Sequence, residues 1–295
     1  MKSVILRIFG IILILVSMLL VCYPFISNYL MGLNQSSEIV AYEQQTDSAG
    51  EDEISEELQA AQEYNKTLLG TVMLTDPFDP NSSDESDYEY QNLLNLSGNS
   101  VMASIEIPVI NVNLPIYHGT SEETLKKGAG HLQKTSLPIG GVGTHSVITG
   151  HTGLSSARLF TDLNLLKKDD VFFIHCLGKT LAYQVDQIKV VEPENTDDLR
   201  IDPKQDYVTL VTCTPYGINT HRLLVRGKRI PYETAQQSIG ESRENESTWM
   251  KEYKRAVFVG SMVFVAIIII YVIIRIVLKR RKIKEENRLN SDNSS

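Results

Sequence analysis

The chain has 295 residues, of which 42% are hydrophobic and 22% are charged, so it has room for one sizeable globular domain and further segments. Its formal net charge of -8 argues against a nucleic-acid partner, because surfaces that bind nucleic acid are basic. Its three cysteines are too few for a fold that depends on disulfides.

Two long apolar stretches lie near the ends, at residues 8–31 and 256–278. Each is long enough to cross a bilayer as a helix. Basic residues precede the first stretch, as in a secretory signal peptide, but its apolar part is longer than usual and no small-x-small cleavage site follows, which favours an uncleaved anchor. Basic residues also follow the second stretch, so the positive-inside rule places residues 1–7 and 279–295 in the cytoplasm. The sequence therefore predicts a two-pass protein of the cell membrane whose middle part is extracellular.

Residues 32–98 have a different composition. From Ser37 to Tyr90 there are 15 Asp and Glu residues against one basic residue, which predicts a solvated stalk. Within this segment, apolar residues recur at helical spacing from Glu51 to Leu69 and predict an amphipathic helix. The Asp-Pro-Phe-Asp-Pro run at 76–80 excludes helix and central strand, because both prolines lack a backbone donor.

Residues 99–232 consist of short apolar runs separated by turns. Runs of this length and spacing predict an antiparallel or mixed β-barrel rather than alternating strands and helices. We expect short helices at Ser121–Lys127 and Leu159–Leu165, and a long, functional loop at Glu192–Gln205. Residues 233–255 form a linker to the second apolar stretch. The expected strands are Val101–Ile107, Val112–Tyr117, Ser146–Thr149, Val171–Cys176, Leu181–Val191, Tyr207–Thr212 and Leu223–Arg229.

The stretch Asp206–Arg229 carries the first chemical signal. Its apolar run ends on Cys213, a Thr-Pro-Tyr-Gly turn follows, and a second strand-like run begins at Arg222. We expect the two runs to be neighbouring strands. A cysteine at a strand end is held rigidly yet remains reachable, and an arginine beside it lowers the thiol pKa and can bind an oxyanion.

Cys213 has other interpretations on this stretch alone. A lone cysteine at a strand end is as readily a small buried hydrophobic residue. Cys22 lies inside the first apolar stretch, so Cys176 is the other cysteine of the middle part, and a disulfide between Cys176 and Cys213 is the structural alternative.

His151 supplies the second signal. It follows an expected strand and is flanked by Gly150 and Gly153, a position where functional residues concentrate. With Cys213 and Arg222 it makes the set that a thiol nucleophile needs. The thiolate attacks a carbonyl carbon, the histidine protonates the leaving amine, and the arginine stabilises the oxyanion.

Three motifs together resemble the sortases, membrane-anchored cysteine transpeptidases of Gram-positive bacteria. They are Val-Thr-Cys-Thr-Pro-Tyr-Gly-x-Asn-Thr-His-Arg, the upstream Thr-Gly-His, and Leu-Pro-Ile-Tyr-His-Gly before that. The resemblance covers about residues 76–229. It implies a mainly β fold, a closed barrel of about eight strands with short helices. It also implies Cys213 as nucleophile, His151 as general acid and base, and Arg222 as oxyanion or substrate ligand, with His221 a bystander on the other face of its strand.

The Asp76-Pro77-Phe78 run, together with the C-terminal apolar stretch, is similar to class C sortases, the pilin polymerases. In these enzymes a lid places an acid and an aromatic residue in the active-site groove. The resemblance implies that Asp76 pairs with Arg222 and that Phe78 covers Cys213. Many relatives carry tryptophan at the aromatic position, and phenylalanine keeps the packing but lacks the indole donor. Without this context, Asp-Pro-Phe is an ordinary turn.

By this resemblance the protein is a membrane-anchored cysteine transpeptidase (peptidase and acyltransferase) that cleaves a Leu-Pro-x-Thr-Gly-like sorting signal through an acyl-enzyme on Cys213. A lysine amine of another pilin subunit then resolves the acyl-enzyme, so the expected partners are pilins with a C-terminal sorting signal, and no cofactor is needed. Three alternatives stay open: a sortase-like cysteine endopeptidase, a transpeptidase that anchors proteins to the cell wall, and a membrane-tethered binding barrel without catalysis.

Overall fold

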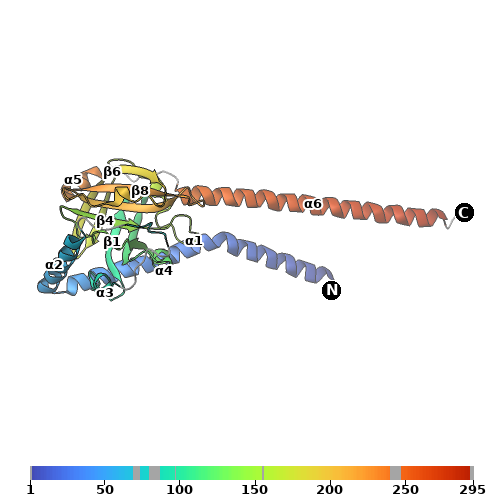
Figure 1. Cartoon of the computed structure of the whole chain (residues 1–295). Helices are drawn as coiled ribbons and strands as arrows, with labels where there is room; N and C mark the ends of the chain where they lie inside the picture. Colours follow the sequence, from blue (N-terminus) through green and yellow to red (C-terminus); the bar gives the residue numbers. More distant parts are fainter. Residues whose placement is uncertain are drawn as a thin grey trace. The chain divides into compact units, whose positions relative to one another are not determined.

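The structure is a computed structural model of the chain (Figure 1). Its contacts divide the chain into two units, Met1–Ser247 and Thr248–Ser295, which are described separately. Parts of the expected lid segment, of the linker and of the tail lie outside the described residues. The described residues are 2–68, 74–79, 87–96, 98–154, 156–239 and 247–292.

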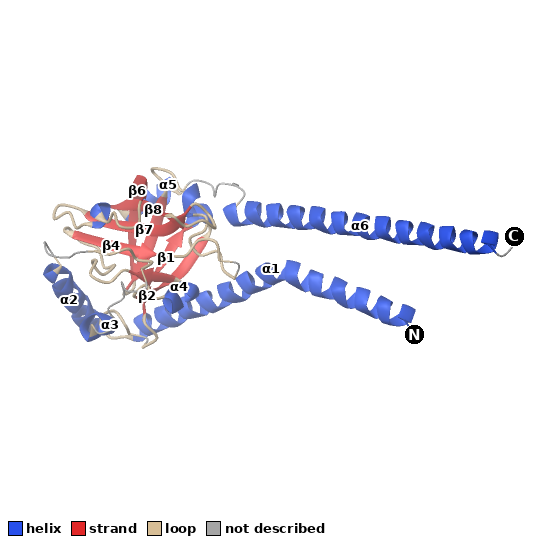
Figure 2. Cartoon of the chain, turned by 45° about the vertical axis from the view of Figure 1, so that its right-hand side comes forward, coloured by secondary structure: helices blue, strands red, loops and turns tan. Residues whose placement is uncertain are grey.

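The first unit contains a closed barrel of eight strands, drawn in red in Figure 2, in the order β1-β2-β3-β4-β7-β8-β6-β5. This confirms the predicted fold class. All seven predicted strands are present, several of them longer by one or two residues at an end. The strands are β1 (Val101–Ile107), β2 (Val112–His118), β3 (Ala129–His131), β4 (Thr144–Thr149), β5 (Val171–Cys176), β6 (Lys179–Val191), β7 (Asp206–Thr214) and β8 (His221–Ile230).

The eighth strand, β3, is the one that the sequence pattern missed. It has three residues, Ala129, Gly130 and His131, and no run of large apolar side chains. Two strand pairs of the barrel, β2 with β3 and β4 with β7, are parallel, and the other pairs are antiparallel. The parallel pairing of β4 with β7 brings their carboxyl ends to the same rim of the barrel.

Alternate side chains of the strands fill the barrel interior, as the period of two along a strand requires. Ile105, Ile148, Phe172, Leu210 and Val225 are all fully buried in this core. Burial of side chains of this size contributes about 1.5–3 kcal/mol each, so the core holds the strand ends in fixed positions.

Three helices precede the barrel, α1 (Lys2–Ser48), α2 (Glu51–Thr67) and α3 (Tyr88–Asn92). The amphipathic helix predicted from Glu51 is confirmed as α2. The prediction of a solvated stalk is wrong, because Tyr42, Tyr64 and Tyr90 of this acidic segment are buried. Most of the acidic side chains lie on the exposed faces of these helices. A prediction from charge composition overlooked the few large aromatic residues that pack the helices against the barrel.

The contacts of Tyr42 show how α1 is fixed to the barrel. Its hydroxyl donates to the Met102 carbonyl at 2.9 Å and accepts from the Leu177 backbone N–H at 3.1 Å. Both views show α1 running along one side of the barrel (Figures 1 and 2). The helix contains Pro24, which removes a backbone donor, and its axis bends (Figure 2).

The short helices match the prediction in part. Helix α4 (Glu122–Lys127) is confirmed, and its cap is Ser121, whose hydroxyl accepts from the Thr124 backbone N–H at 3.2 Å. The helix expected at Leu159–Leu165 is only one 3-10 turn, η2 (Leu163–Leu165). The remaining short helical elements are η1 (Pro108–Ile110), η3 (Asp197–Leu199) and α5 (Tyr232–Ser238).

Among the described residues, two helical spans are long and apolar enough to cross a membrane, and the second unit, the helix α6 (Thr248–Asp292), contains one of them. The other span is Leu15–Ser48 within α1. Length and composition identify both spans, which overlap the two apolar stretches predicted from the sequence.

The barrel interior allows a test of its packing. The rings of Phe172 and Tyr183 stack with their centroids 5.6 Å apart, and a Cβ atom at Gly227 would lie 2.5 Å from Phe172 Cε1. We expect Gly227→Ala to lower the free energy of unfolding by about 1–3 kcal/mol, because the interior has no room for a methyl group. Thermal unfolding of the full-length chain in detergent measures this. Gly32→Ala in α1, where nothing lies within 4 Å of the added atom, is the control, and equal melting temperatures for the two variants would contradict the packing.

Candidate active site

Cys213 and Arg222 lie directly opposite each other on the antiparallel strands β7 and β8. Side chains of such a cross-strand pair lie on the same face of the sheet, with their Cβ atoms about 4.5–5.5 Å apart. The prediction that the two runs are neighbouring strands is therefore confirmed, and the turn between them returns the chain to place the arginine beside the thiol.

This pair lies on the outer face of the barrel. Leu210 on β7 and Val225 on β8 point into the core, so Val211 and Leu224 point outward. Cys213 and Arg222 are two positions from these outward residues and share their face. Arg222 and Cys213 are nevertheless only 9% exposed, because other segments of the chain cover this face.

His151 lies at the same rim. In the parallel pair of β4 and β7, Thr149 is the partner of Val211, and His151 follows Thr149 by two residues as Cys213 follows Val211. The two chains continue together beyond β4, because Gly150 N–H donates to the Val211 carbonyl at 3.0 Å. The register thus brings His151, Cys213 and Arg222 to one site at the ends of three adjacent strands.

Gly150 is required for this arrangement. A Cβ atom at this position would lie 2.7 Å from the ring of Phe160, so no larger residue fits. The Phe160 backbone N–H donates to the His151 carbonyl at 3.1 Å, which fixes the backbone on which the imidazole stands.

Asp76 reaches Arg222 from a segment 146 positions away in the chain. The guanidinium donates two hydrogen bonds to the carboxylate, Nε to Oδ1 at 2.8 Å and a terminal nitrogen to Oδ2 at 2.6 Å. Asp76 also begins a turn, since Asp79 N–H donates to its carbonyl at 3.0 Å, and Pro77 occupies the second position of that turn. The run is both an ordinary turn and a partner of the site.

Phe78 follows in the same turn, and its ring lies against the side chains of His151 and Arg222. Its ring centroid is 5.6 Å from that of His151 and 5.0 Å from the guanidinium carbon of Arg222. These contacts do not involve Cys213, so the cover of Cys213 by Phe78 stays a prediction. The contacts make Phe78 a link between the histidine and the arginine.

The segment that carries Asp76 and Phe78 is held at a second point. Leu74 packs against the outward cluster of Leu132, Val147, Leu199, Val211 and Leu224. Its carbonyl accepts from the Thr196 hydroxyl at 3.2 Å, so the segment is tied to the predicted long loop between β6 and β7.

The electrostatics of the site differ from the expectation for an isolated cysteine and arginine. Burial raises the pKa of the Cys213 thiol to about 11, Arg222 acts to lower it, and Asp76 acts to raise it. Burial lowers the pKa of His151, and the nearby Glu122 opposes this. In this closed arrangement both groups are neutral at pH 7, and the expected depression of the thiol pKa does not occur because burial and the carboxylate outweigh the arginine.

The alternatives for the cysteines are also decided by the structure. All three cysteines are free, so the disulfide between Cys176 and Cys213 does not form. Cys176 is buried beside Tyr42, and burial raises its pKa to about 12. His221 points away from the site, as predicted, and lies 3.1 Å from the carboxylate of Glu192. Cys213 is therefore the thiol that has an arginine and a histidine at its strand end.

Glu122 is the site residue that sequence reasoning missed. Its carboxylate Oε2 lies 3.7 Å from His151 Nε2. The position was recognised only as part of a short helix, and no local pattern in the sequence connects that helix with a histidine 29 positions later. The connection depends on the pairing of β3 with β4, and β3 was itself not predicted.

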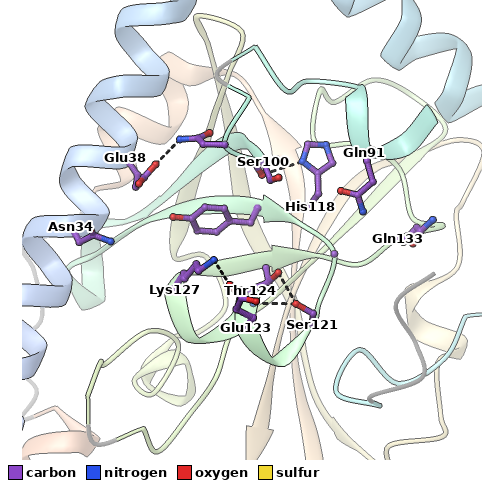
Figure 3. Close-up of a pocket in the computed structure, with 13 residues that line it drawn as sticks. Asn34, Glu38, Gln91, Ser100, His118, Ser121, Glu123, Thr124, Lys127 and Gln133 are labelled. Carbon is purple, nitrogen blue, oxygen red and sulfur yellow. Dashed lines mark hydrogen bonds and ion pairs between the residues drawn. The ribbon is translucent and has the colours of Figure 1, made fainter. Parts of the chain in front are cut away.

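A separate cavity of about 730 Å³ lies between α1 and the region of α4 (Figure 3). Asn34 and Glu38 approach it from α1, and Glu123 and Lys127 approach it from α4. The described residues that line it do not include His151, Cys213 or Arg222, so this cavity and the candidate site are distinct.

An outward thiol beside an arginine, with a histidine at the same rim of a closed eight-stranded barrel, is the arrangement expected of a cysteine acyl-transfer enzyme of the sortase type. The sortase domain model matches residues 105–230. The chain is 51% identical to sortase C-1 of Streptococcus pneumoniae, with a TM-score of 0.63 over 66% of this chain and 99% of that one. It is 46% identical to a pilus-related sortase C of Group B Streptococcus, with a TM-score of 0.59 over 65% of this chain and 96% of that one.

Among curated proteins, sortase A of Streptococcus agalactiae is 28% identical over 177 residues, which are 54% of this chain and 71% of the relative. These matches and the barrel agree. The chain belongs to the sortase family of cysteine transpeptidases, and the solved structures that it resembles are class C sortases.

The contacts of Asp76 and Phe78 allow a test of the closed arrangement. We expect Asp76→Ala/Phe78→Ala to raise the alkylation rate of Cys213 by more than about fivefold. The side chains of the Asp76–Arg222 pair are only 15% and 11% exposed, so breaking it costs more than the about 1 kcal/mol of an exposed pair, and its loss increases the open fraction accordingly. The alkylation midpoint also moves to lower pH, because a carboxylate that raises the thiol pKa is gone while Arg222 remains. The measurement is the rate of iodoacetamide labelling of the Cys213 peptide by mass spectrometry.

The matched control is Asp186→Ala. Asp186 makes the same two-bond pair with Arg226, at 3.0 and 2.7 Å, on the same strand β8. Its loss leaves the labelling of Cys213 unchanged. The double variant melts at nearly the wild-type temperature, because its contacts lie outside the barrel core. Equal labelling rates in the wild type and the double variant would show that the Asp-Pro-Phe run is only a turn.

Proposed function

We propose that this protein is a membrane-anchored pilin polymerase. It cleaves a Leu-Pro-x-Thr-Gly-like sorting signal between Thr and Gly and joins the new carboxyl end to a lysine amine of another pilin subunit. The observation that carries the proposal is the direct cross-strand pairing of Cys213 with Arg222 at the rim where β4 delivers His151.

The first half of the reaction forms the acyl-enzyme. The Cys213 thiolate attacks the carbonyl carbon of the threonine, and Arg222 donates hydrogen bonds to the oxyanion that forms. Protonated His151 gives its proton to the departing glycine amine as the C–N bond breaks. The products are a thioester on Cys213, a neutral imidazole and a released carboxyl-terminal peptide that begins with the glycine amine.

The second half transfers the acyl group. Neutral His151 accepts a proton from the incoming lysine amine, which attacks the thioester carbon, and Arg222 again stabilises the oxyanion. The thiolate then leaves, an isopeptide bond remains, and the protonated histidine is regenerated. No group outside the protein and its two peptide substrates supplies or consumes a proton or electron.

Asp76 and Phe78 form a lid that must move before this reaction. Asp76 occupies two donors of Arg222, and the oxyanion needs donors of the same guanidinium. Phe78 occupies the space between His151 and Arg222. Substrate therefore competes with the lid, and the rate is proportional to the fraction of molecules in which the lid is open.

Similarity to a pilus-related sortase C supports a pilin subunit as substrate and as acceptor. The acceptor distinguishes polymerisation from the other outcomes of the same acyl-enzyme. Water as acceptor gives an endopeptidase, and a cell-wall amine gives an anchoring enzyme. Product mass in the presence of each candidate acceptor identifies the reaction.

Variants of the three site residues test the catalytic assignment. We expect Cys213→Ala to abolish the acyl-enzyme, and His151→Ala and Arg222→Ala to slow its formation about a hundred- to a thousandfold, the cost of losing a proton donor or an oxyanion donor. Intact-mass spectrometry of the full-length chain with a sorting-signal peptide measures this. Cys176→Ala is the matched control and keeps the activity. An acyl-enzyme on Cys213→Ala would refute the assignment.

The two apolar spans, Leu15–Ser48 and Thr248–Val277, support a two-pass arrangement in the cell membrane with the barrel outside. The basic residues beyond each span place both termini in the cytoplasm. We expect a protease added to intact protoplasts to cut between residues 34 and 252 and to spare both termini, as read with terminal epitope tags. Protection of the barrel in intact protoplasts, with cleavage only after lysis, would contradict this arrangement.

A further inference from the structure

Helix α4 presents a charged side chain to the catalytic histidine. The Glu122 carboxylate lies 3.7 Å from His151 Nε2, and this nitrogen is shielded from solvent and has no hydrogen-bond partner among the described residues. An imidazole nitrogen that must donate a proton to a leaving amine is thus left unpaired by the barrel, with a carboxylate as its nearest ion partner.

The position of α4 is firmly set. Ser121 caps the helix, and Leu125 is 1% exposed. A Cβ atom at Gly130 would lie 2.4 Å from the Gly119 carbonyl oxygen and 2.9 Å from Leu125 Cδ2, so helix and strand are in close contact. The first turn of α4, and with it the backbone of Glu122, cannot shift without displacing β3.

Lys126, one turn further along α4, competes with the histidine for this carboxylate. Its ammonium lies 3.0 Å from Glu122 Oε1. Burial lowers the pKa of His151, Glu122 acts to raise it, and Lys126 acts to lower it further. The other charged or titratable groups of the site are Asp76, Cys213 and Arg222.

We propose that Glu122 is a positioning residue for His151, which orients the imidazole and stabilises its protonated form, and that Lys126 limits this effect. The inference rests on the proposed role of His151. It gives α4 a role in the reaction that is implied neither by the sequence motifs nor by the barrel fold.

A specific kinetic signature follows from the order of the two pKa values. Because the thiol pKa lies far above that of the histidine, the active form with thiolate and imidazolium together is a minor one. Between the two pKa values, its fraction equals the acid dissociation constant of the thiol divided by that of the imidazolium. If the acid dissociation constant of the His151 imidazolium falls by some factor, the plateau of kcat/KM therefore rises by the same factor. The acid limb of the pH profile then moves to higher pH by the logarithm of that factor.

The test compares pH profiles of kcat/KM for single variants of the full-length chain, with a sorting-signal peptide as substrate. Glu122→Gln lowers the plateau about two- to fivefold, the range for an exposed charge pair, and moves the acid limb to lower pH by the logarithm of the same factor. Lys126→Gln has the opposite effect on both, because Glu122 loses its competitor. A substitution that raises activity is not expected of a merely structural role.

The next residue pair on the helix is the matched control. Glu123 and Lys127 form the same kind of pair at 2.8 Å, but Glu123 lines the separate cavity. Glu123→Gln therefore leaves the plateau and the acid limb unchanged. Carbon-13 NMR titration of the histidines, with the His151 signal assigned from a variant, gives the same ordering of pKa values without turnover: lowest in Glu122→Gln and highest in Lys126→Gln.

The outcomes separate this inference from the proposed function. An active wild type in which Glu122→Gln and Glu123→Gln give identical profiles overturns the role of Glu122. A loss of activity in Glu122→Gln without movement of the acid limb or the NMR midpoint shows a structural role and also overturns it. A wild type that forms no acyl-enzyme with any sorting-signal peptide overturns the proposed function instead, while the NMR titration still tests the contact.

Discussion

The site depends on one shared group, the guanidinium of Arg222. It stands opposite Cys213 because β7 and β8 pair in that register, and it holds Asp76 with two short hydrogen bonds. A guanidinium has five donors in a fixed plane, so a carboxylate that takes two of them competes with an oxyanion for the same fork. The geometry of one residue therefore connects the barrel, the lid and the chemistry.

The rest of the structure supports this arrangement, because the candidate site residues are on the packed barrel and the lid residues are on a segment outside its core. The packed interior and the parallel pairing of β4 with β7 fix the carboxyl ends of these two strands beside the amino end of β8, so His151 and Cys213 are brought together by register. The lid is held by few contacts, at Leu74, Asp76 and Phe78, all outside the barrel core. In the proposed function, its opening breaks these contacts and leaves the barrel core intact. In the closed arrangement, burial and the Asp76 carboxylate keep the Cys213 thiol protonated.

Much of this was predictable from sequence, for identifiable reasons. Alternating apolar runs located seven strands, and the strand-end positions of His151 and Cys213 indicated the candidate site. Strand β3 was missed because three small or polar residues carry no period, and the role of Glu122 depends on that strand. The acidic segment was misjudged because Tyr42, Tyr64 and Tyr90 are buried among many exposed carboxylates. The raised pKa of the Cys213 thiol could not be predicted, because it depends on how deeply the thiol is buried, and the sequence does not show this depth.

We propose that Arg222 exchanges Asp76 for the substrate during acyl-enzyme formation. A crystal structure of the full-length protein with a sorting-signal peptide joined to Cys213 as a thioester would show this exchange. We expect that Arg222 donates to the thioester oxygen, that Asp76 and Phe78 have left their places over Arg222 and His151, and that the barrel is unchanged. A thioester formed with both Asp76–Arg222 hydrogen bonds intact would contradict it.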